Sequence, residues 1–308
     1  MKVDYVAFDS FGIKSSCTKI TTPDCTITLD PGIAIEASSY PSPLAERFAL
    51  VERYLPKIKA ACRASGIVTV SHYHYDHHNP DVPELYKDKI VLMKDPKANI
   101  NKSQRTRAAY FLEKVKPLAK ELRIADGNEF EFGSTKIIFS EALWHGVERS
   151  RVGKVIMTLV DDGKQRLLHS SDIDGPVIED YVELIASYRP DIIVLDGAPT
   201  YLLGYLVAYR NVRRAISNTI ELLKKSSAKI ILDHHLLRDY RYRELYAAAF
   251  DAAKRLGRTM HTAAEELGKE PDVLRAHKRY GGRWRAWKPL DHELAGKAER
   301  AVKLRSGR

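Results

Sequence analysis

Short segments in which apolar and polar residues alternate open the chain and predict β-strands. They cover residues 2–9, 15–21 and 25–29, and a period of two is typical of a strand that buries one face. Thr22-Pro23-Asp24, between the second and third segments, is typical of a β-turn. We therefore expect the chain to begin as a β-meander.

A longer apolar pattern between residues 43 and 63 predicts an amphipathic helix. Its apolar residues recur at spacings of three and four, namely Leu44, Phe48, Val51, Leu55, Ile58 and Cys62. Pro56 lies inside this segment and should kink or split the helix. An apolar run begins at residue 67 just after Gly66 and predicts a strand, which completes a β-α-β step.

Strands and helices continue to alternate through the rest of the chain. Further strands are predicted at 90–93, 135–139, 153–160, 165–169, 192–195 and 229–232, with two short ones between 122 and 134. Helices are predicted at 103–120, 178–185 and 212–223. This order predicts an α/β fold, a four-layer αββα sandwich of two mixed β-sheets with helices on both outer faces.

Length and composition favour one large domain followed by an appendage. The 308 residues are enough for a sizeable core, and we expect the large domain at 1–256 and a basic, helical or partly irregular extension at 257–308. No apolar stretch is long enough to span a bilayer, and no signal peptide is recognised at the N-terminus, which predicts a cytoplasmic protein without membrane contact. Three cysteines without metal-site spacing predict reduced thiols.

Positive charge is concentrated near the C-terminus. Residues 273–308 contain eleven Lys or Arg and three Asp or Glu, a net +8 of the total of +10, so the rest of the chain carries only +2. Cationic and aromatic residues alternate between 277 and 288, as they do on surfaces that bind single-stranded nucleic acid. A solvated terminal extension, or an arm packed on the body or on a partner subunit, is the competing interpretation.

The densest group of metal-ligand side chains follows the predicted strand at residues 67–71. His72 and His74 lie two residues apart in an extended segment, so both should project to one side and share an ion. Asp76 and His77 come on the turn that follows and could reach a second ion. Imidazole and carboxylate ligands suit Zn(II), with Fe(II) or Mn(II) as alternatives. A histidine-rich surface loop without metal is the competing reading, and His78 is expected to be a bystander.

Later segments contain single residues with ligand chemistry at predicted strand ends. His145 follows a strand and is the expected third ligand of the ion at His72 and His74. Asp172 ends the strand at 165–169 and could bridge two ions, whereas Asp174 is a turn candidate. The last strand ends in Asp233-His234-His235. Since strand ends of such sheets gather along one edge, these side chains are expected to meet.

One more aspartate, Asp30, precedes Pro31-Gly32 at the end of the third strand. It could orient a ligand imidazole from behind the histidine block, or it could be a plain turn residue.

With these residues assembled, the chain resembles the metallo-β-lactamase fold superfamily, and looks like an archaeal-type metallohydrolase branch of it. The strongest motif is His72-x-His74-x-Asp76-His77, and the resemblance covers roughly the first four fifths of the chain. It implies one ion held by His72, His74 and His145 and another held by Asp76, His77 and His234, with Asp172 bridging them. His234 is preferred to His235 because it lies closer to the strand end. Trp144 and Gly146 flank His145 where many relatives differ, so the substrate is not specified.

The resemblance implies a binuclear metal-dependent hydrolase with two divalent ions. A hydroxide bridging them would attack a lactone, thioester or phosphoester, with Asp172 as the bridge and Asp76 orienting the hydroxide. His235, Arg238 and residues 196–201 are candidate donors to the developing oxyanion by position. We expect a small-molecule substrate and allow for a homo-oligomer. The alternatives are a nuclease or nucleic-acid phosphodiesterase that uses residues 273–308, and an inactive metal-binding scaffold.

Overall fold

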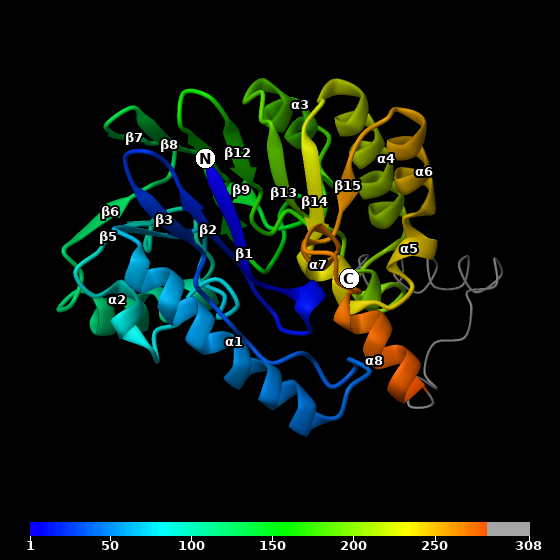
Figure 1. The fold of residues 1–308 in the computed structure, drawn as a ribbon, viewed down its shortest axis with the longest axis horizontal. Helices are drawn as coiled ribbons and strands as arrows, with labels where there is room; N and C mark the ends of the chain where they lie inside the picture. The colour runs from blue at the N-terminus through cyan, green and yellow to red at the C-terminus, as the bar shows by residue number, and fades with distance from the viewer. Residues whose placement is uncertain (282–308) are drawn as a thin grey trace.

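Two mixed β-sheets form the centre of the molecule in the computed structural model, which describes residues 1–281 (Figure 1). The first sheet has six strands in the order β1 (Lys2–Phe8), β2 (Ser16–Thr21), β3 (Thr26–Leu29), β4 (Ile67–Val70), β5 (Ile90–Met93) and β6 (Glu121–Ile124). Strands β1 to β3 pair antiparallel, and β3 to β6 pair parallel. The predicted opening meander is therefore confirmed.

The second sheet has seven strands. Their order is β15 (Met260–His261), β14 (Lys229–Asp233), β13 (Ile192–Asp196), β12 (Arg166–His169), β11 (Thr158–Asp161), β8 (Thr135–Phe139) and β7 (Glu129–Phe132). Strands β12 to β15 are parallel, and β7, β8, β11 and β12 pair antiparallel. The predicted hairpin across the Asp-Gly turn is β11–β12. A separate two-stranded ribbon joins β9 (Leu143–Trp144) to β10 (Lys154–Val155).

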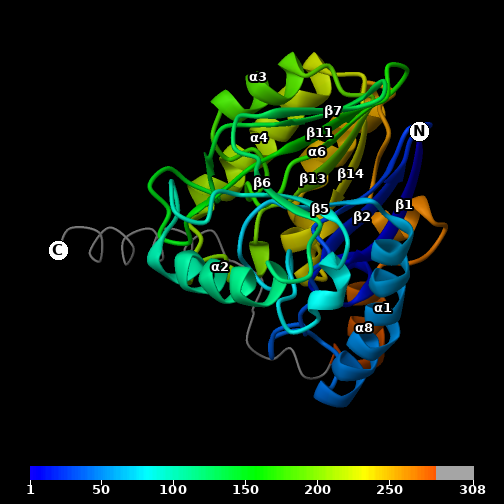
Figure 2. The same ribbon diagram turned by 90° about the vertical axis from the view of Figure 1, so that its left-hand side faces the viewer.

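Helices cover the outer face of each sheet (Figure 2). The first sheet packs against α1 (Leu44–Ala64) and α2 (Lys102–Val115). The second sheet packs against α3 (Asp180–Ser187), α4 (Tyr209–Lys225) and α6 (Ala247–Arg255). The remaining helices are short: α5 (Tyr242–Leu245), α7 (Ala263–Glu266), α8 (Asp272–Tyr280), and the 3-10 helices η1 (Asp9–Phe11), η2 (Pro83–Tyr86), η3 (Thr200–Leu202) and η4 (His234–Arg238).

Buried side chains on the central strands point to alternate sides and so fill separate cores. In β13, Ile192 and Val194 pack between the two sheets, whereas Ile193 and Leu195 pack under the outer helices. Because β13 is buried on both faces, its residues from Ile192 to Leu195 are all apolar. The layers are therefore helix, sheet, sheet and helix, and the predicted α/β sandwich is confirmed.

Three local expectations differ from the structure. Helix α1 runs unbroken through Pro56, so the predicted split is wrong. Helix α2 ends at Val115, five residues before the predicted end at 120. Strand β4 ends at Val70, so the histidine block begins on the loop after the strand rather than on the strand itself. That loop can therefore turn its side chains in more directions than a strand allows.

Residues 257–281 pack against the rest of the domain. Strand β15 pairs with β14 at the edge of the second sheet, and α8 packs beside η1, with Val273 and Ala276 buried. Regular packing thus continues past the predicted boundary, while most of the cationic and aromatic stretch lies outside the described residues. Among the helices at 1–281, none combines the length and the apolar character needed to cross a membrane.

Candidate metal centre

The predicted ligands gather from the ends of strands in both sheets. The loop after β4 carries His72, His74, Asp76 and His77. Three later segments each add one side chain, namely His145 after β9 in the two-stranded ribbon, Asp172 after β12, and His234 at the start of η4. The structure therefore brings together all seven residues that the sequence pattern and the family resemblance pointed to.

Asp172 lies at the middle of the cluster and faces two groups of imidazoles. Its Oδ2 atom is 3.4 Å from Nε2 of His72 and 3.1 Å from Nε2 of His145. Its Oδ1 atom is 2.9 Å from Nε2 of His77 and 3.4 Å from Nε2 of His234. The carboxylate is 1% exposed. Each of its two oxygens is thus aimed at a different set of ligand nitrogens.

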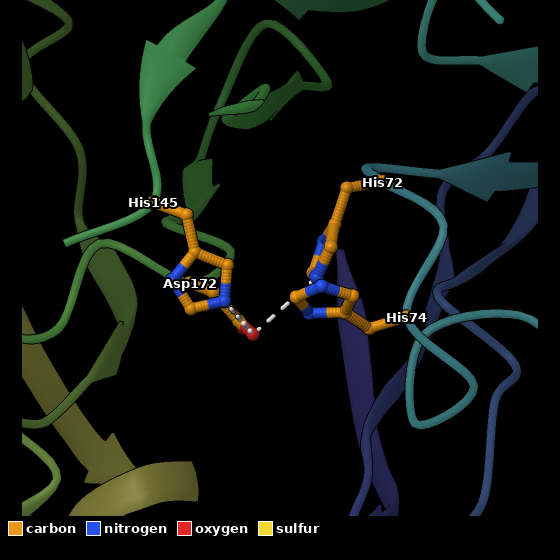
Figure 3. Close-up of side chains that lie close together, drawn as sticks. All are labelled: His72, His74, His145 and Asp172. Carbon is orange, nitrogen blue, oxygen red and sulfur yellow. Dashed lines mark ion pairs between the residues drawn. The ribbon is translucent and has the colours of Figure 1, made fainter. Parts of the chain in front are cut away.

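The first group contains His72, His74, His145 and Asp172, and Figure 3 shows their side chains converging from opposite sides. One ligand atom from each residue lies within 4.8 Å of the others. The ring centroids of His72 and His74 are 4.5 Å apart, and those of His74 and His145 are 5.1 Å apart. Three imidazoles and a carboxylate in this arrangement could hold one metal ion.

The second group contains Asp76, His77 and His234, with ligand atoms that again lie within 4.8 Å of one another. The Nε2 atoms of His77 and His234 are 3.2 Å apart, and Asp76 Oδ2 is 3.8 Å from His234 Nε2. With Asp172 Oδ1 as the shared ligand, this group could hold a second ion. The structure shows the grouping that the family resemblance implied for these residues.

Hydrogen bonds to the far side of the rings fix which nitrogen each histidine presents. Asp30 Oδ2 lies 2.8 Å from His77 Nδ1, and Asp9 Oδ1 lies 2.7 Å from His234 Nδ1. Ser71 Oγ is 3.1 Å from His72 Nδ1. Such partners hold a ring so that its other nitrogen points at the metal position. Asp30 thus has the orienting position that the sequence allowed, rather than that of a plain turn residue.

Electrostatics differ between the two groups of histidines. Burial lowers the pKa of His72 to about 4, so this ring is neutral and its Nε2 is free to bind a metal. Burial alone would also lower the pKa of His77, but the carboxylates of Asp172 and Asp30 outweigh it and raise that pKa to about 10. Burial opposes ionisation of Asp172, yet the surrounding histidines hold its pKa well below its usual range.

Several buried polar atoms in the cluster have no hydrogen-bond partner among residues 1–281. They include Nε2 of His72 and both carboxylate oxygens of Asp172. Buried polar groups normally have partners, so atoms left without one call for an explanation. A metal ion coordinated by these atoms would satisfy them, which is why the residues present fit a metal site.

The other side chains with ligand chemistry take different positions. His78 is buried, its Nδ1 donates to the carbonyl of His74 over 2.8 Å, and its ring packs on Phe111, so it faces away from the cluster. Nε2 of His169 donates to the carbonyl of Ser16 over 3.1 Å, as a structural residue would. His78, which the sequence predicted to be a bystander, thus contacts the backbone and Phe111 rather than the cluster.

His235 and Asp174 border the first group. Nδ1 of His235 donates to Asp196 Oδ1 over 3.0 Å, and its Nε2 is 3.8 Å from Asp172 Oδ2. Asp174 Oδ1 is 3.7 Å from Nδ1 of His145. Burial raises the pKa of Asp174 to about 6. The ring centroid of His235 is 4.4 Å from that of His234 and 5.7 Å from that of His145. His235 therefore borders both groups, and with Asp172 and His234 it forms a further set of side chains that could hold an ion.

Asp9 and Glu36 are site residues that the sequence did not reveal. Asp9 accepts from His234 and also from Arg238 Nε over 2.5 Å. Glu36 is 1% exposed, and neither of its oxygens has a hydrogen-bond partner within the described part of the chain. Burial and the nearby Asp9 raise the pKa of Glu36 to about 8. Asp9 directly follows an alternating strand, but an aspartate at a strand end is too common a feature to have identified it.

A cavity of about 340 Å³ opens onto both groups. Its polar lining includes His74, Asp76, His145, His235 and Arg238. Its apolar lining includes Val147, Val152, Val177, Leu202, Leu206 and Val207. The volume lies in the range of small-molecule sites.

Proteins of one family resemble this chain over nearly its whole length. UPF0282 protein MK0213 of Methanopyrus kandleri is 38% identical over 291 residues, which cover 90% of this chain and 98% of that protein. A UPF0282 protein of Metallosphaera sedula is 38% identical over 285 residues, covering 91% and 92% of the two chains. This chain therefore belongs to the UPF0282 family. No protein-family model matches the sequence.

Solved structures with a similar fold share little sequence with it. Unliganded yeast PDE1 superposes with a TM-score of 0.52 at 10% identity, covering 84% of this chain and 96% of that one. YhfI of Bacillus subtilis, a metallo-β-lactamase fold protein, gives 0.47 at 13% identity, covering 80% and 88%. YhfI has the metallo-β-lactamase fold, which is the superfamily that the sequence motifs resemble. At these identities the likeness concerns the fold alone.

Proposed function

We propose that this protein is a binuclear metal-dependent hydrolase. The observation that carries the proposal is the position of Asp172, whose two buried and otherwise unpartnered oxygens each face a separate group of imidazoles. A metal-binding scaffold without activity would have no need of a substrate-sized cavity, yet a cavity opens onto both groups. The metallo-β-lactamase fold and the clustered His and Asp side chains support the same assignment.

Imidazole makes up most of the donor set and favours Zn(II), with Fe(II) or Mn(II) as alternatives. When bound, two such ions supply a hydroxide nucleophile near neutral pH and polarise the bond to be cleaved. Asp172 holds the two metal positions in register, and Asp76, which also lines the cavity, is placed to orient the nucleophile. Asp30 and Asp9 keep the rings of His77 and His234 in the binding orientation.

The cavity supports a small substrate with an apolar group. Its lining combines the ligand side chains His74, Asp76 and His145 with apolar side chains such as Val177, Leu202 and Val207. A lactone, thioester or phosphoester could place its reacting bond at the ligands and its apolar group against these apolar side chains. Each methylene buried there contributes about 0.8 kcal/mol. The apparent kcat/KM should therefore rise about fourfold for each methylene added to the substrate until the apolar lining is covered.

An activity screen of metal-loaded protein tests this function. The panel contains lactones, thioesters, phosphomonoesters and phosphodiesters of increasing alkyl length. The Asp172→Ala variant should lose activity by at least about 100-fold, more than an outer partner of a ligand usually costs. His78→Gln is the matched control, because His78 belongs to the same histidine block but faces away from the cluster. Equal turnover by the wild type and by Asp172→Ala would reject the proposal.

A further inference from the structure

A buried arginine, Arg238, lies among the ligand atoms of the second group. Arg238 lies on η4, one helical turn after His234, and is 6% exposed. Its Nη2 atom is 3.1 Å from Asp76 Oδ2 and 3.4 Å from His234 Nε2. Both of these atoms belong to the second metal position.

The arginine is fixed in place by two further contacts. Its Nε donates to Asp9 Oδ2 over 2.5 Å, and its Nη1 donates to the hydroxyl of Tyr201 over 3.2 Å. Asp9 in turn holds the ring of His234. The guanidinium therefore bridges Asp9 and Asp76 and cannot leave the site without breaking several buried hydrogen bonds.

No equivalent cation is seen at the first group within the described residues. The ionisable neighbours of His72 and His145 there are other histidines, Asp172 and Asp174. A ligand atom binds Zn(II) at about 2.1 Å. An ion bound to His234 Nε2 would thus lie at most about 5.5 Å from the guanidinium nitrogen, counting the 3.4 Å contact. An arginine stays protonated in proteins, so it repels a divalent ion at that distance.

We propose that Arg238 makes the two metal positions unequal, so that the first position fills tightly and the second fills only at higher metal concentration. The inference rests on the proposed two-ion site. Arg238 is here a positioning residue, because it holds Asp76 and Asp9 while its charge opposes the second ion. A protein of this kind would carry one resident ion and gain its second, and with it full activity, in response to the metal supply.

Titration of the metal-free full-length protein with Zn(II), followed by calorimetry and by competition with a chromophoric chelator, tests the inference without measuring activity. The wild type should bind two ions in separate steps whose dissociation constants differ by about tenfold or more. In Arg238→Gln the second constant should fall by about the same factor while the first is unchanged. Arg238→Lys keeps the charge and should keep the two steps apart.

The matched control is Arg241→Gln, which removes the same charge from an arginine that pairs with Asp239 over 2.9 Å. It should leave both steps as in the wild type. The inference would be overturned by two equal dissociation constants in the wild type, or by a difference between the two constants that persists in Arg238→Gln. Either result would still be compatible with a two-ion hydrolase. A wild type that binds no zinc at all would instead reject the proposed function. If Arg238→Gln does not fold, Arg238→Met, which also removes the charge, is titrated in its place and should show the same tighter second step.

Discussion

At the scale of single residues, the site depends on carboxylates that sit behind the ligands. Asp30 accepts from His77 Nδ1 and also from the backbone N–H and hydroxyl of Ser71, at 2.8 and 2.5 Å. Asp9 has a similar place behind His234. These two buried aspartates fix the rings of the second group, so changes to them should affect metal binding before they affect the fold.

Replacing Asp30 with Asn should weaken metal binding by roughly 10- to 100-fold, because the His77 ring loses a charged acceptor that orients it. The measurement is the dissociation constant for Zn(II) of the wild type and the variant. Asp272→Asn is the control, since Asp272 is a buried carboxylate that contacts Tyr40 and Arg275 away from the cluster. Unaltered zinc affinity in Asp30→Asn would show that Asp30 does not support the site.

Because the pKa of Glu36 is raised, the free energy of unfolding should depend on pH. Burial raises its pKa to about 8 from an ordinary value of 4.5. The folded state therefore holds this proton more firmly than the unfolded state, and the stability it contributes below pH 4.5 is lost as the pH rises toward 8. In metal-free protein, Glu36→Gln should raise the thermal midpoint at pH 8 by roughly 2 °C or more, and by less at pH 5. An equal shift at both pH values would contradict this assignment.

At the scale of elements, the backbone at Gly32 comes very close to the backbone of the ligand loop after β4. A Cβ atom on Gly32 would collide with backbone atoms of Asp76, His77 and His78. The segment after β3 therefore passes directly against the loop that carries the second group of ligands. Only glycine allows this distance, which explains the Pro-Gly pair at the end of the third predicted strand.

Gly32→Ala should lower the free energy of unfolding by roughly 2–3 kcal/mol and reduce bound metal, because the loop must shift. Gly66→Ala is the matched control, since a Cβ there meets no atom within 4 Å. Chemical denaturation and metal analysis of both variants give the comparison. Gly32→Ala with the stability and the metal content of the control would refute the role of this contact.

Local spacing was sufficient to predict most elements and the histidine block. The alternating segments at 2–9 and 15–29 became β1 to β3, and His72, His74, Asp76 and His77 were recognised because they are close in sequence. Arg238 was a candidate for the site by its position, but its contact with Asp9 was not predicted, because it joins residues 229 apart in the chain. Such pairs form only when both sheets have assembled, and no local pattern encodes them.

At the scale of the whole molecule, the four layers bring two halves of the chain to one edge. The first sheet supplies the loop after β4, and the second supplies Asp172 and His234. Since each half provides only part of either ligand group, neither half should bind two ions alone. Near the C-terminus, α8 packs on this body, whereas residues 282–308 lie outside the described structure.

Removal of residues 282–308 tests the nucleic-acid alternative and leaves every described element, including α8, in the chain. The truncated protein should keep α8, with its Asp272 contact to Tyr40, and hydrolyse small substrates as the full chain does. If the tail binds nucleic acid, salt-sensitive binding of single-stranded RNA or DNA should disappear with it. Electrophoretic mobility shifts at two salt concentrations measure this. Binding that survives the truncation would assign it to another surface.

Anomalous diffraction from crystals soaked in saturating Zn(II) tests whether Asp172 bridges two metal ions. Two peaks about 3.5–4 Å apart are expected. One should lie beside Asp172 Oδ2 and the other beside Oδ1, each within the ligand group that faces that oxygen. A single peak at saturation, or peaks that do not contact Asp172, would show that Asp172 does not bridge two ions.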